Sequence, residues 1–324
     1  MITHADRSLT VARATGATLA AALAMAGAAG CGARGTDAGG GGTTDAGGTD
    51  SGTFITEALQ CDDGAGGLGP CDFSCLYTAF DPAPLAITAP DTLELTGIVN
   101  DFFDNVPVMG ATVEVWLDNS VELGTPDGVS GITAADGAFT ISLDPAAVPG
   151  LTGNVRVAYR TTINDPDYVD TYEFNEFASA ADETMLERFT VPQLTVQIIL
   201  GLFNLTLDPA GGQIAGAFED CGRANVANGI VRVFSDPHVC GSAGEQLSII
   251  IGYFDGNEYP DPNQTDLNSD GLWLGANVTA PRVVIEVWGS LTAGAPAQLV
   301  GCGPIDVEPG TIDIIDMAPY AMAL

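Results

Sequence analysis

The stretches 95–101 (LTGIVND), 108–116 (VMGATVEVW) and 133–141 (TAADGAFTI) carry the strongest structural signal in this chain. Apolar and polar residues alternate in them, which is the pattern of half-buried β-strands. The pair Asp136-Gly137 stands before the last strand and supplies the residue types that a tight turn requires. The stretches therefore predict strand, turn and strand, followed by an Asp-Gly turn into another strand.

The same unit recurs later in the chain, at 214–220 (IAGAFED), 226–234 (VANGIVRVF) and 270–274 (DGLWL). Self-similarity of this kind indicates that one structural unit is built twice. We therefore expect an all-β fold of two tandem antiparallel β-sandwiches, the first in residues 91–190 and the second in residues 211–324. The repeat bears on architecture and assigns no chemistry.

The first copy resembles the carboxypeptidase regulatory-like domain. The family pattern G-x-V-x-D, P-V-x-G-A-x-V-x-V and T-x-x-D-G-x-F-x-I is present at 97–101, 107–115 and 133–141, and more loosely over 212–290. The resemblance implies a transthyretin-like or immunoglobulin-like sandwich that serves exported proteins as a non-catalytic accessory module. A related sandwich of surface stalks, the Cna-B type, is often locked by a Lys–Asn isopeptide bond. This chain contains no lysine and cannot form that bond.

The charge of the chain is strongly one-sided. It has 42 Asp and Glu residues against 9 basic residues, all of which are arginine, and its formal net charge is -33. Such a surface repels nucleic-acid phosphates, so we expect no nucleic-acid partner. A soluble acidic surface that resists association is the simpler interpretation, and attraction of divalent cations is the alternative.

Residues 1–30 are typical of an export signal, with a basic beginning and an Ala/Gly/Leu-rich stretch at 14–29 that is too short for a membrane span. The stretch ends in an AAGC motif that resembles the bacterial lipobox. The resemblance implies cleavage before Cys31 and a lipid on that cysteine, which would make the bilayer a partner. Because Ala28 stands where the lipobox usually has leucine, ordinary cleavage after Ala26 or Ala28 is the alternative.

Residues 31–53 consist almost wholly of Gly, Ala, Thr, Ser and Asp, a composition that cannot form a core. We expect a flexible tether after the lipidated cysteine, with a mean reach of roughly 25 Å. By the sorting rule of some bacterial lipoproteins, the non-acidic Gly32 favours the outer membrane. A cysteine-containing segment, residues 54–90, then leads into the first sandwich.

Six cysteines remain after Cys31, an even number in a chain expected to be exported. We predict three disulfides among them. Sequence proximity favours a Cys221–Cys240 pair, with Cys302 bound to one of the N-terminal cysteines. A zinc site at Cys71 and Cys75 is the alternative, although it lacks a nearby histidine. The six candidates are Cys61, Cys71, Cys75, Cys221, Cys240 and Cys302.

Residues 191–210 form a linker between the two copies. The apolar run 194–205 is too long for one buried strand, so we expect a helix of about ten residues that packs between the domains. A β-strand is the second interpretation of the same run.

Histidine is nearly absent from the chain. His238 is the only one beyond the signal, and its setting in a Ser-Asp-Pro-His sequence predicts a surface turn. A serine–histidine triad would depend on this one ring, and a multi-histidine metal site cannot be built. We therefore expect that the protein is not an enzyme and needs no cofactor beyond a structural calcium ion.

Calcium is the metal that the sequence favours. Asp266, Asn268 and Asp270, followed by Gly271, match the first half of an oxygen-ligand loop, D-x-N-x-D-G. The twelfth position is Asn277 in place of glutamate, so the loop is not an EF-hand. A metal-free acidic loop is the alternative.

Three tryptophans could support sugar binding, namely Trp116, Trp273 and Trp288. The first two match aromatic residues in the other copy, which favours packing over ligand binding. We expect a structural or adhesive surface lipoprotein with an unidentified protein or glycan partner. The alternatives are a carbohydrate-binding, starch-binding-like surface lipoprotein, with or without calcium, and an accessory subunit of a secreted hydrolase.

Overall fold

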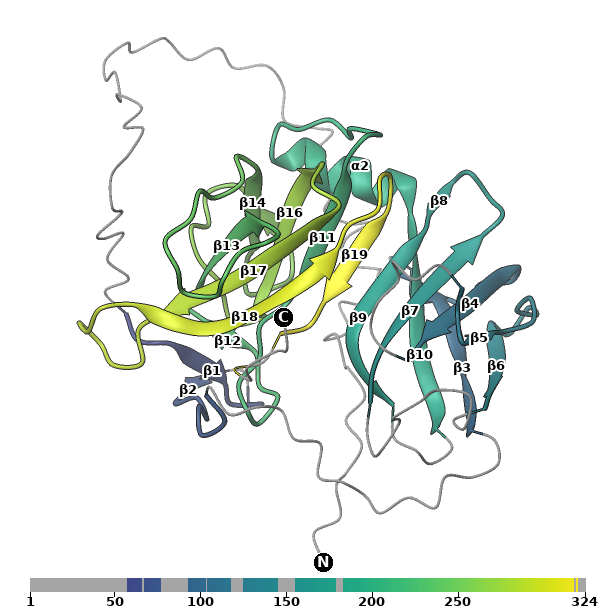
Figure 1. Cartoon of the computed structure of the whole chain (residues 1–324), viewed down its shortest axis with the longest axis horizontal. Helices are drawn as coiled ribbons and strands as arrows, with labels where there is room; N and C mark the ends of the chain where they lie inside the picture. The colour runs from purple at the N-terminus through teal and green to yellow at the C-terminus, as the bar shows by residue number, and fades with distance from the viewer. Residues whose placement is uncertain are drawn as a thin grey trace, which may run out of the picture.

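A computed structural model describes residues 57–65, 67–76, 93–102, 104–117, 125–144, 155–178, 183–317 and 319. Strands dominate these residues, with a single helix among them, and they form several sheets (Figure 1). The expected signal, Cys31 and the tether lie outside the described residues. The predicted all-β sandwich fold is confirmed.

The first unit packs two sheets face to face around one apolar core. One sheet has the order β6-β3-β10-β8, with strands Ala138–Leu143, Leu93–Asp101, Glu183–Pro192 and Tyr168–Val169. The other has the order β5-β4-β7-β9, with strands Gly128–Val129, Ala111–Trp116, Val155–Ile163 and Thr171–Ala178. Burial alternates along β3 and β6, so each contributes every second residue to the core, as their sequence pattern predicts.

The second unit repeats this arrangement with longer loops. One side has the order β15-β14-β16-β11-β19, with strands Pro260–Asp261, Ile250–Phe254, Leu272–Val278, Gly212–Ala217 and Ile312–Ile315. The facing sheet has the order β13-β17-β18, with strands Ile230–Ser235, Arg282–Gly289 and Gln298–Asp306. Both sheets contribute to the largest apolar core of the molecule.

The strand pairings confirm that one unit is built twice. Strand β3 pairs antiparallel with β6 and parallel with β10, and β11 pairs antiparallel with β16 and parallel with β19. Strands β4 and β7 pair antiparallel, as do β13 and β17. The prediction of antiparallel sandwiches therefore misses one parallel pairing in each copy.

A glycine lies at the equivalent place in both parallel pairings. A Cβ atom on Gly97 would collide with the carbonyl oxygen of Leu186, and one on Gly216 with the carbonyl oxygen of Ile315. Only glycine allows the neighbouring backbone to approach this closely. The repeated glycine of the two sequence copies thus has a common physical cause.

The two units share one continuous sheet. Strand β19 lies between β11 of the second unit and β9 of the first and pairs parallel with both, which makes a nine-stranded sheet. Helix α2 (Gln193–Leu202) confirms the predicted helix. It packs Val196 and Leu200 into a small core that also contains Val191, Leu274 and Ile312, residues of both units. The units are therefore joined by backbone hydrogen bonds as well as by apolar packing.

The N-terminal segment lies on the second unit, although the first unit follows it in sequence (Figure 1). Strand β1 (Gln60–Asp62) pairs with β2 (Leu68–Gly69) and with β12 (Val226–Ala227) of the second unit. The chain thus packs on the second unit before it reaches β3 of the first, an arrangement that the sequence does not predict. We call its described part, residues 57–65 and 67–76, the strap.

Candidate functional site

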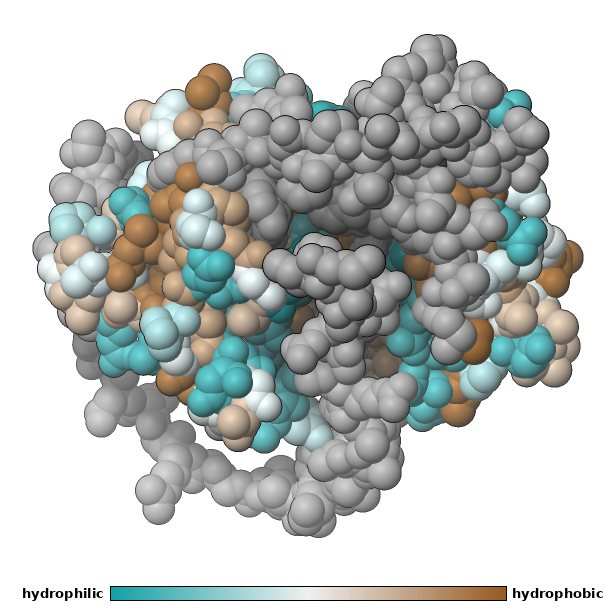
Figure 2. Space-filling view, turned by 90° about the horizontal axis from the view of Figure 1, so that it is seen from below, coloured by the Kyte–Doolittle hydropathy of each residue, from teal (hydrophilic) through white to brown (hydrophobic). Residues whose placement is uncertain are grey.

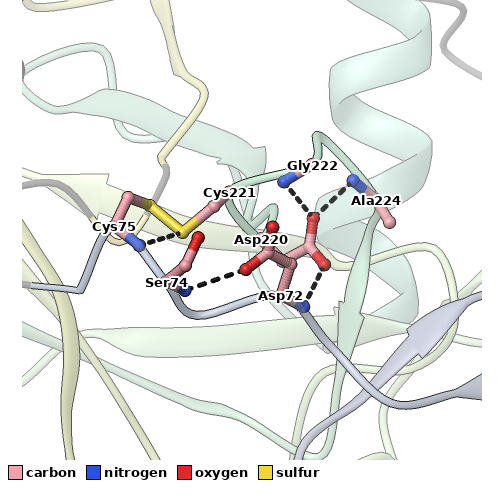
Figure 3. Close-up of a disulfide and its surroundings, with 7 residues drawn as sticks. All are labelled: Asp72, Ser74, Cys75, Asp220, Cys221, Gly222 and Ala224. Carbon is pink, nitrogen blue, oxygen red and sulfur yellow. Dashed lines mark hydrogen bonds between the residues drawn. A yellow bond between two sulfur atoms is a disulfide. The ribbon is translucent and has the colours of Figure 1, made fainter.

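The strap is held to the second unit by a disulfide. Cys75 bonds to Cys221, which follows β11, with 5.8 Å between their Cα atoms and 146 residues between them in sequence (Figure 3). The Cys75 N–H also donates to Cys221 Sγ over 3.0 Å. Beside the disulfide, the Cys221 N–H donates to the carbonyl oxygen of Asp72 over 2.8 Å.

The carboxylate of Asp220 organises this junction (Figure 3). Its Oδ2 accepts the N–H of Asp72 in the strap over 2.7 Å. Its Oδ1 accepts the N–H groups of Gly222 and Ala224 over 2.8 and 3.0 Å. Asp220 is only 3% exposed, so its charge is stabilised by these three donors rather than by water. One buried side chain thus shapes the turn and binds the strap to it.

The six predicted disulfide cysteines are all paired, but the favoured connectivity is wrong. The bonds are Cys61–Cys71, Cys75–Cys221 and Cys240–Cys302. Cys221 follows β11 and Cys240 follows β13, and these strands belong to different sheets. Cys302 lies on β18, in the same sheet as β13, and it is this residue that meets Cys240.

The zinc alternative is contradicted by the same bonds, because Cys71 and Cys75 each bond to another cysteine. Within the described residues, one group of three potential ligands converges, Cys61, Cys71 and Asp220. Its two sulfurs form a disulfide and its carboxylate accepts three backbone N–H groups. This group therefore stabilises the junction and is not a metal site.

The His238 side chain is only 6% exposed, so the predicted surface position of its ring is wrong, although Asp236 and Pro237 before it form an exposed bend. Its ring stacks on Phe234 with centroids 3.8 Å apart, and its Nε2 lies 3.0 Å from Glu286 Oε1. Glu286, on β17, also accepts the N–H of Gly241 and the indole N–H of Trp288. These contacts fix the segment before Cys240 against β17, which is a structural role.

Two of the three tryptophans proposed for sugar binding are inside the protein. Trp116 is 5% exposed and Trp273 is 1% exposed. Trp288 is half-buried, and the guanidinium of Arg232 lies 5.2 Å from its ring centroid. The packing interpretation therefore holds for Trp116 and Trp273.

The predicted calcium ligands each have a partner within the protein. Asp266 Oδ1 accepts from the Gln264 side chain over 3.1 Å. Asn268 Oδ1 accepts the N–H of Ser269 over 2.7 Å, and Asp270 Oδ1 accepts the N–H of Leu272 over 3.0 Å. The Asp266 carboxylate thus contacts a side chain of its own loop. The calcium site stays a prediction.

Two buried charged or polar groups were not singled out by the sequence. Arg188 on β10 contacts Glu173 on β9 over 2.8 Å across the interior of the first unit, and its guanidinium lies 4.0 Å from the Tyr159 ring centroid. In the second unit, burial raises the pKa of Asp313 on β19 well above its ordinary value. Thr311 Oγ1 lies 3.1 Å from each of its carboxyl oxygens, so a protonated Asp313 has a hydrogen-bond acceptor.

No protein-family model matches the sequence, and no curated protein matches it. Among solved structures, the shaft pilin spaA from Lactobacillus rhamnosus GG is similar at a TM-score of 0.23 and 11% identity, over 72% of this chain and 100% of that one. The Bacillus anthracis TIE protein has a TM-score of 0.20 and 12% sequence identity, over 70% of this chain and 33% of that one. A streptococcal ancillary pilin has a TM-score of 0.20 and 10% sequence identity, over 71% of this chain and 63% of that one. TM-scores this low transfer no function.

Within the residues that the structure describes, no helix has the length and apolar character needed to cross a bilayer.

Proposed function

We propose that this chain is an exported, lipid-anchored and non-catalytic module with a structural or adhesive role at the bacterial envelope. The lipid on Cys31 would hold it to the bilayer, with the outer membrane favoured, and residues 32–53 would space it from the surface. The carboxypeptidase regulatory-like resemblance supports this reading, because that family serves as an accessory module.

The attachment of the strap to the second unit is the observation that carries the proposal. The strap follows the expected tether directly, and it is bound to the body by a disulfide, by the Asp220 carboxylate and by strand pairing with β12. A chain that must transmit force from a tether to a folded body requires such an attachment at this place. Pairing of all six cysteines also suits an oxidising compartment outside the cytoplasm.

The body itself is suited to act as one rigid piece. Backbone hydrogen bonds between β19 and β9 cross from one unit to the other, and α2 covers the junction. On the coloured parts of the face in Figure 2, hydrophilic and hydrophobic residues are interspersed, as expected of a surface that resists association. The partner at the far side would be a surface glycan or protein.

The anchor is tested by fractionation and lipid labelling. The native chain is expected to incorporate labelled palmitate and to sediment with membranes, and Cys31→Ser is expected to do neither. A Cys31→Ser protein that stays on the membrane would contradict the lipid anchor. Hydrolase assays on cell-envelope glycans and peptides test the non-catalytic role, and turnover that depends on the purified chain would contradict it.

A further inference from the structure

The two copies of the Asp-Gly turn differ in the surroundings of the aspartate. In both, the carboxylate accepts the N–H two residues ahead, from Ala138 to Asp136 Oδ1 over 3.2 Å and from Leu272 to Asp270 Oδ1 over 3.0 Å. Asp136 is exposed, so water can bind its other oxygen. Asp270 is only 7% exposed, and its Oδ2 is buried with no hydrogen-bond partner among the described residues.

The turn that begins at Asp255 lies beside the loop that contains this aspartate, and the described part of the first copy shows no counterpart of this turn. Asp255 Oδ1 accepts the N–H groups of Asn257 and Tyr259 over 2.8 and 3.0 Å, which holds its carboxylate at the turn. A Cβ atom on Gly256 would lie 3.0 Å from Ser269 Oγ and 3.5 Å from Asn268 Oδ1. The turn after Asp255 therefore packs directly on the residues that precede Asp270.

The charges in this contact are unbalanced. Burial, with a smaller contribution from the nearby carboxylate of Asp255, raises the pKa of Asp270 to about 6. Among the described residues, no arginine forms an ion pair with either one. A buried carboxylate oxygen without a donor, next to a second carboxylate, calls for a compensating cation.

We propose that Asp255 and Asp270, with side-chain oxygens of Asn268 and Ser269, bind a calcium ion between the two turns. Carboxylate, amide and hydroxyl oxygens are the ligands that calcium takes in proteins, and its flexible coordination tolerates a mixed set. Asp255 and Ser269 replace Asp266 of the sequence motif in this ligand set, because the turn after Asp255 packs on Asn268 and Ser269. With two charged ligands, the affinity belongs to the range of extracellular modules, a Kd of about 0.1–1 mM.

Calcium titration of the full chain, after removal of divalent ions with EDTA, tests this site. Measurements at pH 7.5 in 150 mM NaCl suppress general attraction to the acidic surface. If the Kd is about 1 mM, 10 mM calcium should raise the melting temperature by roughly 3–6 °C. Isothermal titration should show one site, and magnesium should have a smaller effect because it dehydrates reluctantly.

Three variants separate the site from the rest of the surface. Asp255→Asn and Asp270→Asn should lose the calcium response, and without calcium Asp270→Asn should melt at or above the wild-type temperature, since it removes a repulsive charge. Asp136→Asn, the matched change in the first copy, should keep the full response. The proposal is overturned if the wild type shows neither binding heat nor stabilisation at 10 mM calcium, or if Asp270→Asn responds like the wild type.

Discussion

Replacing Asp220 by alanine removes the acceptor for three backbone N–H groups, those of Asp72, Gly222 and Ala224. A buried donor left unpaired costs about 1–3 kcal/mol. Asp72 and Gly222 are exposed residues whose N–H groups can bind water in the variant. The total cost is therefore less than three times the upper value for one buried donor. We expect Asp220→Ala to lower the free energy of unfolding by about 2–4 kcal/mol, with the strap loosened before the body unfolds.

Urea unfolding followed by far-UV circular dichroism measures this loss. With an m value of about 3 kcal/mol/M, the midpoint should fall by roughly 1 M. Loosening of the strap is read separately, as faster reduction of Cys75–Cys221 by dithiothreitol in native buffer. The rate for Cys240–Cys302, which is in the facing sheet and donates no hydrogen bond to Asp220, should not change.

Two matched variants make this prediction refutable. Asp220→Asn keeps an oxygen for Gly222 and Ala224 but presents an amide to the N–H of Asp72, so it should cost about half as much as alanine. Asp136→Ala removes an exposed carboxylate with one N–H bond and should stay within about 0.5 kcal/mol of the wild type. An Asp220→Ala chain as stable as Asp136→Ala, with unchanged reduction kinetics, would refute the reasoning.

Three further predictions concern the interior. Arg188→Met removes the arginine that pairs with the buried Glu173 and should lower the free energy of unfolding in urea by about 3–5 kcal/mol, most of which should be recovered when Glu173 is also made apolar. Because the folded-state pKa of Asp313 is raised, its stabilising contribution is present at low pH and lost as pH rises through that pKa. Asp313→Asn should therefore melt higher than the wild type at pH 8, with a smaller difference at pH 5; equal melting curves at both would contradict this. Gly216→Ala forces the backbone of Ile315 away and should cost about 1–3 kcal/mol, and an unchanged stability would contradict the close approach.

The elements that repeat could be predicted because their causes are local. Alternating apolar residues mark β3 and β6, and the Asp-Gly turns place Gly137 and Gly271 at positive φ, where glycine is favoured. The helix at 193–202 follows from an apolar run too long for one strand. These features depend on residues close together in sequence.

The features that sequence analysis missed depend on residues far apart. Strand β19 pairs with β11 of its own unit through one edge. Nothing in its sequence indicates that its other edge pairs with β9 of the first unit. The Cys221 partner lies 146 residues earlier because the strap crosses to the second unit. His238 stands in a turn-like sequence, but Glu286 from β17 supplies the contact that buries it.

Asp220 illustrates the limit for the candidate site. One aspartate among 42 acidic residues carries no sequence signal of its own. Its role arises because β11 ends where the strap arrives, so that one carboxylate meets donors from both segments. Likewise, the sequence motif groups Asp270 with Asp266, whereas in the fold the turn after Asp255 packs on the residues that precede Asp270.

Single-molecule pulling on the chain from its two ends tests most directly whether the strap transfers load to the second unit. With the Cys75–Cys221 bond intact, force passes from the strap to β11 and bypasses the first unit. At ~3.6 Å per extended residue, the 146-residue separation corresponds to about 53 nm. The oxidised wild type should therefore extend about 53 nm less on complete unfolding than the Cys75→Ser/Cys221→Ser chain. Equal extension of the two chains would contradict the account.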